Sequence, residues 1–282
     1  MATQNNNFEN YYQSLYKERW PILKKSLLIQ VMPAAFSDGL KKPYMMDRAS
    51  IIAAQALRLP KNGLILDACA APGGKSLVIA SCMGKKTVLV ANELSAQRRQ
   101  RLSLILDEHL DDEKRQRIKI TGIDAARLGS MSKEQNKYDA ILLDVPCSSE
   151  RHVMQDEKAF SKWTSARPRF LSQRQWSLLS AAFLILKEGG SLVYSTCAIT
   201  PEENDNVAER LFAKYKNRVL LDEPDFAEGE KTKYGRIILP DVCDGIGPMY
   251  VARFGKTKTP LPTEKAPAPE QLDLQDCDLL AK

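Results

Sequence analysis

The chain has 282 residues, of which 44% are apolar and 27% are charged, close to the averages of soluble globular proteins. No stretch approaches the roughly 18–20 consecutive apolar residues of a membrane span, and the Asn-rich start does not resemble a secretory signal. We therefore expect a cytoplasmic protein without a membrane partner. The six cysteines and two histidines lack zinc-site spacing, so we expect reduced thiols and no metal.

Basic residues outnumber acidic ones by 41 to 35, and their placement is uneven. Residues 1–60 carry eight Lys or Arg against four Asp or Glu, and residues 147–187 carry seven against three. This pattern suits a phosphate backbone, although ordinary solubilising charge explains it equally well. The segments open to both interpretations are Lys24–Lys25, Lys41–Lys42 and Arg167–Arg174.

In chain order, residues 10–29 show helical spacing and predict one or two short helices, and residues 31–42 predict a loop. A helix is expected after the capping residue Asp47. Strands and helices then alternate. The expected strands are 63–67, 87–93, 118–124, 138–146, 191–197, 236–239 and 249–254, and the expected later helices are 75–83, 95–109, 169–186 and 202–215.

This alternation predicts an α/β fold with a mostly parallel, seven-stranded sheet covered by helices on both faces. We expect three regions: an N-terminal helical extension (1–43), a catalytic domain (44–255) and a flexible C-terminal tail (256–282). In open sheets of this kind, ligands bind outside the carboxyl ends of the strands.

The first candidate site is the segment DACAAPGGK, residues 67–75, between a predicted strand and a helix. Its small residues allow a ligand to approach the backbone, and the helix start offers free N–H groups. A phosphate-binding P-loop is disfavoured because its first glycine position holds Cys69, and a dinucleotide fingerprint is absent. A plain strand-to-helix turn remains open.

Acids end three successive predicted strands: Glu93, Asp124 and Asp144. An acid after the second strand is placed to bind both ribose hydroxyls of a nucleoside, and Asp124 would then lie beside the adenine. A lone acid of this kind is usually a helix cap or a solvated charge. Three acids beside a glycine turn favour a nucleoside cofactor.

Two cysteines follow predicted strands, Cys147 in DVPCSSERH and Cys197 in YSTCAITPEEN. Either alone is most simply a small buried residue. Together they suggest reactive thiols, since a thiolate forms where positive charge or a helix N-terminus lowers its pKa. The helix expected near Pro201, and Lys75, could act in this way on Cys197.

These three segments resemble the signature motifs of the Nop/Sun (Fmu/Sun, RsmB/Nop) family of RNA cytosine-5 methyltransferases, over residues 44–254. The resemblance implies a Rossmann-like class I methyltransferase fold and S-adenosyl-L-methionine as cofactor. Glu93 stands where many members carry Asp, which keeps the carboxylate. Segments such as the Ser-Glu-Arg-His after Cys147 also look like the branch that methylates mitochondrial ribosomal RNA.

The resemblance also implies residue roles. Cys197 would attack carbon 6 of cytosine, Cys147 would assist release of the methylated RNA, Asp144 would bind the base, and Lys75 would contact the base or reacting centre. The cofactor would be lined by Cys69, Ala70, Ala71, Pro72, Gly73, Gly74, Lys75, Glu93, Arg98, Asp124 and Asp144.

We expect a monomer acting on ribosomal RNA, with transfer RNA as the second choice. One rival is a non-catalytic RNA-binding ribosome assembly factor. Others are a nucleotide hydrolase and a methyltransferase for a protein or a small molecule. The paired cysteines favour RNA cytosine-5 methylation over these rivals.

Overall fold

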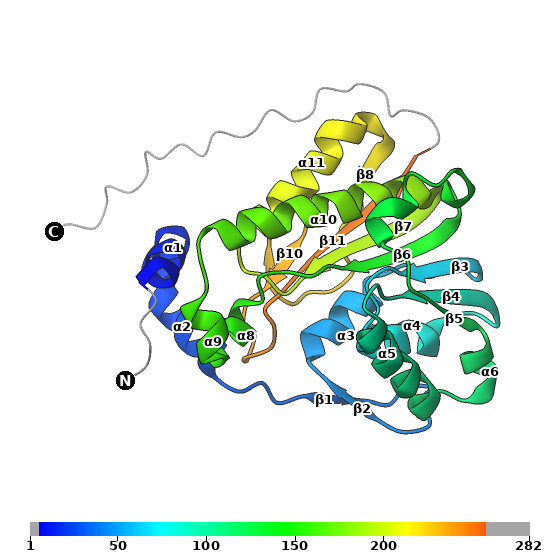
Figure 1. Cartoon of the computed structure of the whole chain (residues 1–282), viewed down its shortest axis with the longest axis horizontal. Coiled ribbons are helices and arrows are strands. Elements are labelled where there is room, and N and C mark those ends of the chain that lie inside the picture. Colours follow the sequence, from blue (N-terminus) through cyan, green and yellow to red (C-terminus); the bar gives the residue numbers. More distant parts are fainter. Residues whose placement is uncertain (1–5, 258–282) are drawn as a thin grey trace.

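The computed structural model describes residues 6–257, so the predicted tail lies almost entirely outside the described residues. Within these residues the core is a nine-stranded sheet (Figure 1). Eight strands follow the order β5-β4-β3-β6-β7-β11-β10-β9, and β8 also pairs with β11. The strands are β3 (Asn62–Asp67), β4 (Lys86–Asn92), β5 (Ile118–Thr121), β6 (Tyr138–Asp144), β7 (Leu186–Thr196), β8 (Val219–Leu221), β9 (Glu230–Lys231), β10 (Arg236–Ile238) and β11 (Met249–Lys256).

Strands β5, β4, β3, β6 and β7 are mutually parallel, and β11, β10, β9 and β8 add antiparallel pairs. The α/β fold with a mostly parallel sheet is therefore confirmed. The sheet has two strands more than predicted, β8 and β9. Both are only two or three residues long, too short to show a hydrophobic period.

Side chains alternate between two cores, one on each face of the sheet. Leu66, Ile141 and Tyr194 belong to one core, and their neighbours Ile65 and Val193 belong to the other. Such double-faced burial is the reason the parallel strands read as continuous apolar runs.

Helices cover both faces (Figure 1). The helices on one face are α10 (Ala166–Ile185), α11 (Asp205–Tyr215) and α7 (Ala125–Leu128), and those on the other are α3 (Arg48–Gln55), α4 (Gly74–Cys82) and α5 (Ala96–His109). Shorter elements are α6 (Asp112–Gln116), α8 (Glu150–Gln155), α9 (Glu157–Ser161), η2 (Ser132–Glu134), η3 (Pro201–Glu203) and η4 (Lys216–Arg218). No helix within residues 6–257 is long and apolar enough to cross a membrane.

The N-terminal segment is helical, as expected, and forms α1 (Asn6–Tyr16), η1 (Lys17–Arg19) and α2 (Trp20–Leu28). Its aromatic side chains pack against the segment between α9 and α10: Phe8 lies 5.0 Å from Trp163, centroid to centroid, and Tyr12 lies 5.6 Å from the same ring. The segment thus extends the core on one face of the sheet.

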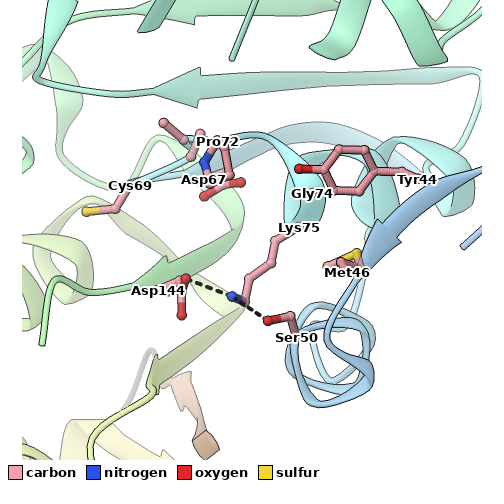
Figure 2. A pocket seen from close by; sticks show the side chains of 11 residues that line it. Tyr44, Met46, Ser50, Asp67, Cys69, Pro72, Gly74, Lys75 and Asp144 are labelled. Carbon is pink, nitrogen blue, oxygen red and sulfur yellow. Dashed lines mark hydrogen bonds and ion pairs between the residues drawn. The ribbon is translucent and has the colours of Figure 1, made fainter. Parts of the chain in front are cut away.

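The predicted loop at residues 31–42 is partly wrong, because β1 (Ala34–Phe36) pairs with β2 (Tyr44–Met46) as a two-stranded antiparallel ribbon. Gly39, at φ +64°, supplies a left-handed residue in the connection, and Lys41 N donates to His109 O (2.8 Å) at the end of α5. The ribbon places Tyr44 and Met46 over the start of α4 (Figure 2).

Candidate active site

The candidate site residues gather where the parallel strands end. Asp67 ends β3, Glu93 follows β4, and Asp144 ends β6 opposite Ser195 of β7. Cys197 follows directly after β7. Because neighbouring parallel strands present their carboxyl ends at one edge, residues far apart in the sequence meet there.

The glycine turn after β3 approaches its neighbours closely. A Cβ on Gly74 would lie 2.8 Å from Tyr44 Cε1, and Gly73, at φ +124°, packs against Leu102 and Ile105 of α5. Gly73 therefore shapes the turn and does not line the pocket beneath it. That first pocket (Figure 2) is lined by Tyr44, Met46, Ser50, Asp67, Cys69, Ala70, Ala71, Pro72, Gly74, Lys75 and Asp144.

Asp67 is fully enclosed at the floor of the first pocket. Its Oδ2 accepts from Ser76 Oγ (2.6 Å), whereas its Oδ1 is buried without a hydrogen-bond partner. Burial raises the pKa of Asp67 to about 7. One oxygen of Asp67 is therefore left free of protein hydrogen bonds beside the pocket.

Lys75 and Asp144 form an ion pair across the first pocket, with Nζ 2.8 Å from Oδ2 (Figure 2). Lys75 Nζ also contacts Ser50 Oγ (3.3 Å), and Ser195 Oγ donates to Asp144 Oδ1 (2.9 Å). Burial lowers the pKa of Lys75, but the charge and hydrogen bond of Asp144 outweigh it, so the net pKa lies above its ordinary value. Lys75 is a fixed cation at the edge of the sheet.

A second pocket lies beyond β4 and is lined by Ala68, Cys69, Asn92, Glu93, Leu94, Ser95, Arg98, Ile123, Asp124, Ala125, Pro146, Arg174 and Leu178. Glu93 Oε1 accepts from Ser95 N (2.9 Å), while its buried Oε2 accepts no hydrogen bond, although Arg98 Nη1 lies 3.2 Å away. Arg98 also donates to Ala71 O (2.7 Å) and so links the two pockets. Cys69 lines both pockets, and burial raises the pKa of its thiol, which keeps it protonated.

Asp124 lies in the second pocket, and its carboxylate is already engaged. It caps α7 by accepting from Ala126 N (3.1 Å), and it pairs with Arg174 of α10. The hydrogen bond from Arg174 lowers the pKa of Asp124, so this carboxylate is ionised. The sequence left Arg174 open between phosphate contact and solvated surface; in the structure it pairs with Asp124 of the second pocket.

Cys147 and Cys197 meet beside the first pocket, with Sγ atoms 3.0 Å apart. Ser149 Oγ lies 3.2 Å from Cys197 Sγ and 3.4 Å from Cys147 Sγ. Ser149 adopts a left-handed backbone conformation at φ +54°, which turns the chain back over the two thiols.

The two thiols differ in acidity. The hydrogen bond that Cys147 donates, together with that of Ser149, lowers the pKa of Cys197 despite its burial. Sharing that hydrogen bond raises the pKa of Cys147. Cys197 is thus the more acidic thiol of the pair and the one that ionises first. The hydrogen bonds that lower the pKa of Cys197 thus come from Cys147 and Ser149. The helix that was expected to do so near Pro201 is, at that point, the three-residue η3.

Apart from Gly73, the predicted residues therefore lie in one continuous region, with Lys75, Asp144 and the cysteines on one side and Glu93 and Asp124 on the other. Reasoning from the sequence missed Ser149 and the two acids behind the cysteines, Glu150 and Glu203, and it named Arg174 only as part of a basic segment. The segments CSSERH and PEEN contain three of these four residues, but no residue spacing revealed their contacts.

The family model for the 16S rRNA methyltransferase RsmB/F matches residues 54–255. The chain belongs to this family. The resemblance of its three motifs to the Nop/Sun enzymes is thereby confirmed.

Two kinds of curated relative resemble this family member. The "5-cytosine rRNA methyltransferase NSUN4" of Bos taurus is 32% identical over 77% of this chain and 60% of its own length. The "Ribosomal RNA small subunit methyltransferase F" of Aeromonas salmonicida is 36% identical over 76% of this chain and 45% of its own length. The chain thus spans only about half to three fifths of the length of these relatives.

Solved structures share the fold. NSun6 from Pyrococcus horikoshii, crystallised with SFG, superposes with a TM-score of 0.66 at 25% identity, covering 79% of this chain and 55% of its own. A methyltransferase homologue from the same organism superposes with a TM-score of 0.70 at 22% identity, covering 90% of this chain and 96% of its own. The Rossmann-like methyltransferase fold is confirmed.

Proposed function

We propose that this chain is an S-adenosylmethionine-dependent methyltransferase that forms 5-methylcytosine in ribosomal RNA. The observation that carries the proposal is the pair of thiols 3.0 Å apart, of which Cys197 is the more acidic, beside the Lys75–Asp144 ion pair. A methyltransferase that acts on nucleophilic oxygen or nitrogen needs no thiolate of its own. Carbon 5 of cytosine is a poor nucleophile and needs covalent activation.

The two pockets fit the methyl donor. Glu93 Oε2 is buried, pairs with Arg98 without accepting a hydrogen bond, and is suited to ribose hydroxyls, and Asp67 Oδ1 also accepts no hydrogen bond. Leu94, Ile123 and Pro146 give the second pocket apolar walls for a purine ring. NSun6 was crystallised with SFG, an analogue of S-adenosylmethionine. When bound, S-adenosylmethionine would supply an electrophilic methyl group.

In the first chemical step, the Cys197 thiolate would add to carbon 6 of the base and form a carbon–sulfur bond. The electron pair of the 5,6 double bond then becomes available at carbon 5 for attack on the methyl group, whose bond to the donor sulfur would break with its electron pair left on that sulfur. Asp144 would bind the polar edge of the cytosine, and Lys75 would hold Asp144 in place at 2.8 Å.

Product release reverses the addition. A base removes the proton from carbon 5, the 5,6 double bond forms again, and the carbon–sulfur bond to Cys197 breaks with its electron pair returning to sulfur. We assign Cys147 to this release, because its Sγ lies 3.0 Å from that of Cys197. Loss of Cys147 would therefore trap the RNA on Cys197.

A surface suited to RNA leads to the site. Lys158, Lys162, Arg167 and Arg169 are exposed and make no ion pair with the described part of the chain. Beside them, 71% of Phe170 is exposed, an aromatic ring on which a base can stack. Arg167, Arg169 and Phe170 lie at the start of α10, and this helix continues to Arg174 at the second pocket.

Charge reversal tests this surface. The double variant Arg167→Glu/Arg169→Glu should weaken RNA binding at least tenfold and leave donor binding unchanged. The matched control is Lys85→Glu/Lys86→Glu, an equal charge change at the start of β4, at the opposite edge of the sheet. Equal weakening by both variants would mean that only net charge matters and would contradict a binding surface.

Methyl transfer itself is tested by incubating the protein with labelled donor and with separate ribosomal and transfer RNA fractions from cells whose RNA lacks the modification. Cys82→Ala, which removes an exposed cysteine, is the control for cysteine loss. Labelled 5-methylcytosine in ribosomal RNA supports the proposal. Label in transfer RNA alone favours the second substrate. RNA and donor binding without any label, also on unmodified ribosomal subunits, favours a non-catalytic assembly factor.

A further inference from the structure

Directly behind the two cysteines, Ser148 lies between two buried carboxyl groups. Its Oγ is hydrogen-bonded both to Glu150 Oε1 and to Glu203 Oε1. All three residues have no solvent-exposed surface. The two glutamates are 53 positions apart in the sequence and are brought together by the meeting of the segments that follow β6 and β7.

The other hydrogen bonds of these carboxyl groups come from neutral donors. Glu150 accepts from Tyr12 Oη (2.6 Å) and Ile199 N (3.1 Å). Glu203 accepts from Ser148 N (2.9 Å), from Gln175 Nε2 (2.7 Å) and from Thr200 Oγ1 (3.3 Å). None of the ion pairs among residues 6–257 includes either glutamate.

Counting hydrogens shows that a proton is missing if both groups are ionised. A serine hydroxyl donates one hydrogen, and an ionised carboxylate only accepts. Ser148 can therefore donate to one glutamate only, and its contact with the other needs a hydrogen from that carboxyl group. Two buried, unpaired charges so close would also repel each other strongly, which favours keeping one proton.

We propose that Glu150 and Glu203 hold one proton between them through Ser148, and that this bridge positions Cys147 and Cys197 for the reaction. The positioning role rests on the proposed function; the held proton does not. Ser148 follows Cys147, and its N–H is bound by Glu203 from the other segment. Ile199 follows Cys197 by two residues, and its N–H is bound by Glu150. Each of the two segments thus binds a backbone N–H group of the other.

The acidity of the two groups agrees with a held proton. Burial raises the pKa of Glu203 to about 7, with the charge of Glu150 as the next cause, and burial also raises the pKa of Glu150. The titratable groups that face the pair are neutral tyrosines and the two cysteines, and they bring no positive charge: Tyr11, Tyr12, Tyr16, Tyr194, Cys147 and Cys197.

The bridge predicts an unusual pattern among isosteric variants. In Glu203→Gln, the amide nitrogen can donate to Ser148 Oγ while Ser148 donates to Glu150, and the amide oxygen can still accept from Ser148 N and Gln175 Nε2. In Glu150→Gln, the amide nitrogen can likewise donate to Ser148 Oγ, but it replaces the oxygen that accepts from Tyr12 Oη, so that one hydrogen bond is lost. In the double variant, the two amide oxygens are needed by the backbone N–H groups of Ser148 and Ile199, so both amide nitrogens face Ser148 Oγ and its hydrogen has no acceptor. Glu203→Gln should therefore fold nearly as stably as wild type at neutral pH, Glu150→Gln slightly less stably, and the double variant clearly less stably than either.

The held proton also fixes the direction in which stability changes with pH. The folded state keeps a proton that the unfolded chain releases near the ordinary glutamate value of 4.5, so the stability it contributes is lost as pH rises toward about 7. The unfolding constant of the wild type should change by up to about tenfold per pH unit in that window for one proton. Both single variants should lose this pH-dependent contribution to stability, because glutamine does not titrate.

The test compares wild type, both single variants, the double variant and the exposed control Glu157→Gln. Unfolding is measured from pH 4.5 to 8, and infrared difference spectra against wild type record the carbonyl band of a buried carboxylic acid. The proposal expects that band to be lost, and the pH slope reduced, in each single variant but not in the control. An unchanged slope and an unchanged band in both single variants would overturn the held proton.

Positioning is measured by the alkylation rate of Cys197 and by the pH profile of methyl transfer. The wild type should lose activity as the bridge ionises, and each single variant should keep rising through the same pH range as Cys197 ionises. Profiles identical to wild type would overturn the positioning role. If wild type transfers no methyl group to any RNA, the proposed function fails, and the infrared and unfolding results still decide the bridge.

Discussion

Lys75 Nζ lies 2.8 Å from Asp144 Oδ2, and this ion pair joins the glycine turn after β3 to the end of β6. A second lysine–aspartate pair, Lys187–Asp139, has nearly the same length, 2.7 Å, but Lys187 is 43% exposed against 14% for Lys75. The two pairs therefore separate the effect of burial from that of contact.

Replacing Lys75 with Met should leave the Asp144 carboxylate without its cation in a half-buried site. We expect a loss of about 3 kcal/mol in unfolding free energy, since breaking a buried pair strands a charge. Lys187→Met, the matched control, should cost below about 1 kcal/mol because Lys187 is itself exposed and Asp139 keeps a hydrogen bond from Leu64 N (2.8 Å). Urea unfolding measures both, and equal losses would contradict a special role for burial in the active-site pair.

The thiolate of Cys197 should form at lower pH than an ordinary thiol, because Cys147 and Ser149 hydrogen-bond to it. Alkylation of Cys197, followed by mass spectrometry as pH rises, should reach half its maximal rate below the midpoint of the exposed Cys82. Ser149→Ala should move the Cys197 midpoint upward. A midpoint equal to that of Cys82 in the wild type would refute the assignment of the thiolate.

Binding of the methyl donor should depend on Glu93 and not on Cys197. Glu93→Gln replaces a charged acceptor in the second pocket and should weaken binding of an S-adenosylmethionine analogue about tenfold to a hundredfold. Cys197→Ala should leave that binding unchanged and abolish methyl transfer. Calorimetry measures both affinities, and weakened binding in Cys197→Ala would contradict its assignment as a nucleophile outside the donor site.

The N-terminal helices should contribute to stability through their aromatic contacts. Trp20 is 2% exposed and stacks on Tyr12 at 5.2 Å, so Trp20→Ala should cost about 3–5 kcal/mol. Ile22, on the same helix, is 63% exposed, and Ile22→Ala should be nearly neutral. Equal effects in thermal unfolding would argue that α2 does not belong to the core.

The sequence predicted what depends on local pattern. Apolar runs that end in an acid gave the parallel strands, and the motifs at their ends gave Lys75, Asp144 and the two cysteines. These predictions succeed because a parallel strand buries both faces and because its carboxyl end is fixed by the fold class. The ribosomal RNA preference had no such local basis and came from the family resemblance alone.

What the sequence did not predict depends on contacts between distant segments. From the sequence alone, Arg174 resembles an ordinary surface charge. In the structure, α10 places it beside Asp124, which lies 50 positions earlier. Glu150 and Glu203 read as solvated acids until Ser148 brings them together. Strands β8 and β9 form by pairing at the edge of an existing sheet, and their own two or three residues carry no period.

The most direct test of the account is the covalent adduct. Cys147→Ala is incubated with the methyl donor and with the RNA that wild type methylates, then denatured, digested and analysed by mass spectrometry. The account predicts a protein–RNA adduct that survives denaturation and maps to Cys197, and that is absent from Cys147→Ala/Cys197→Ala. A folded, RNA-binding Cys147→Ala that forms no adduct, or an adduct on any other residue, would contradict covalent catalysis by Cys197.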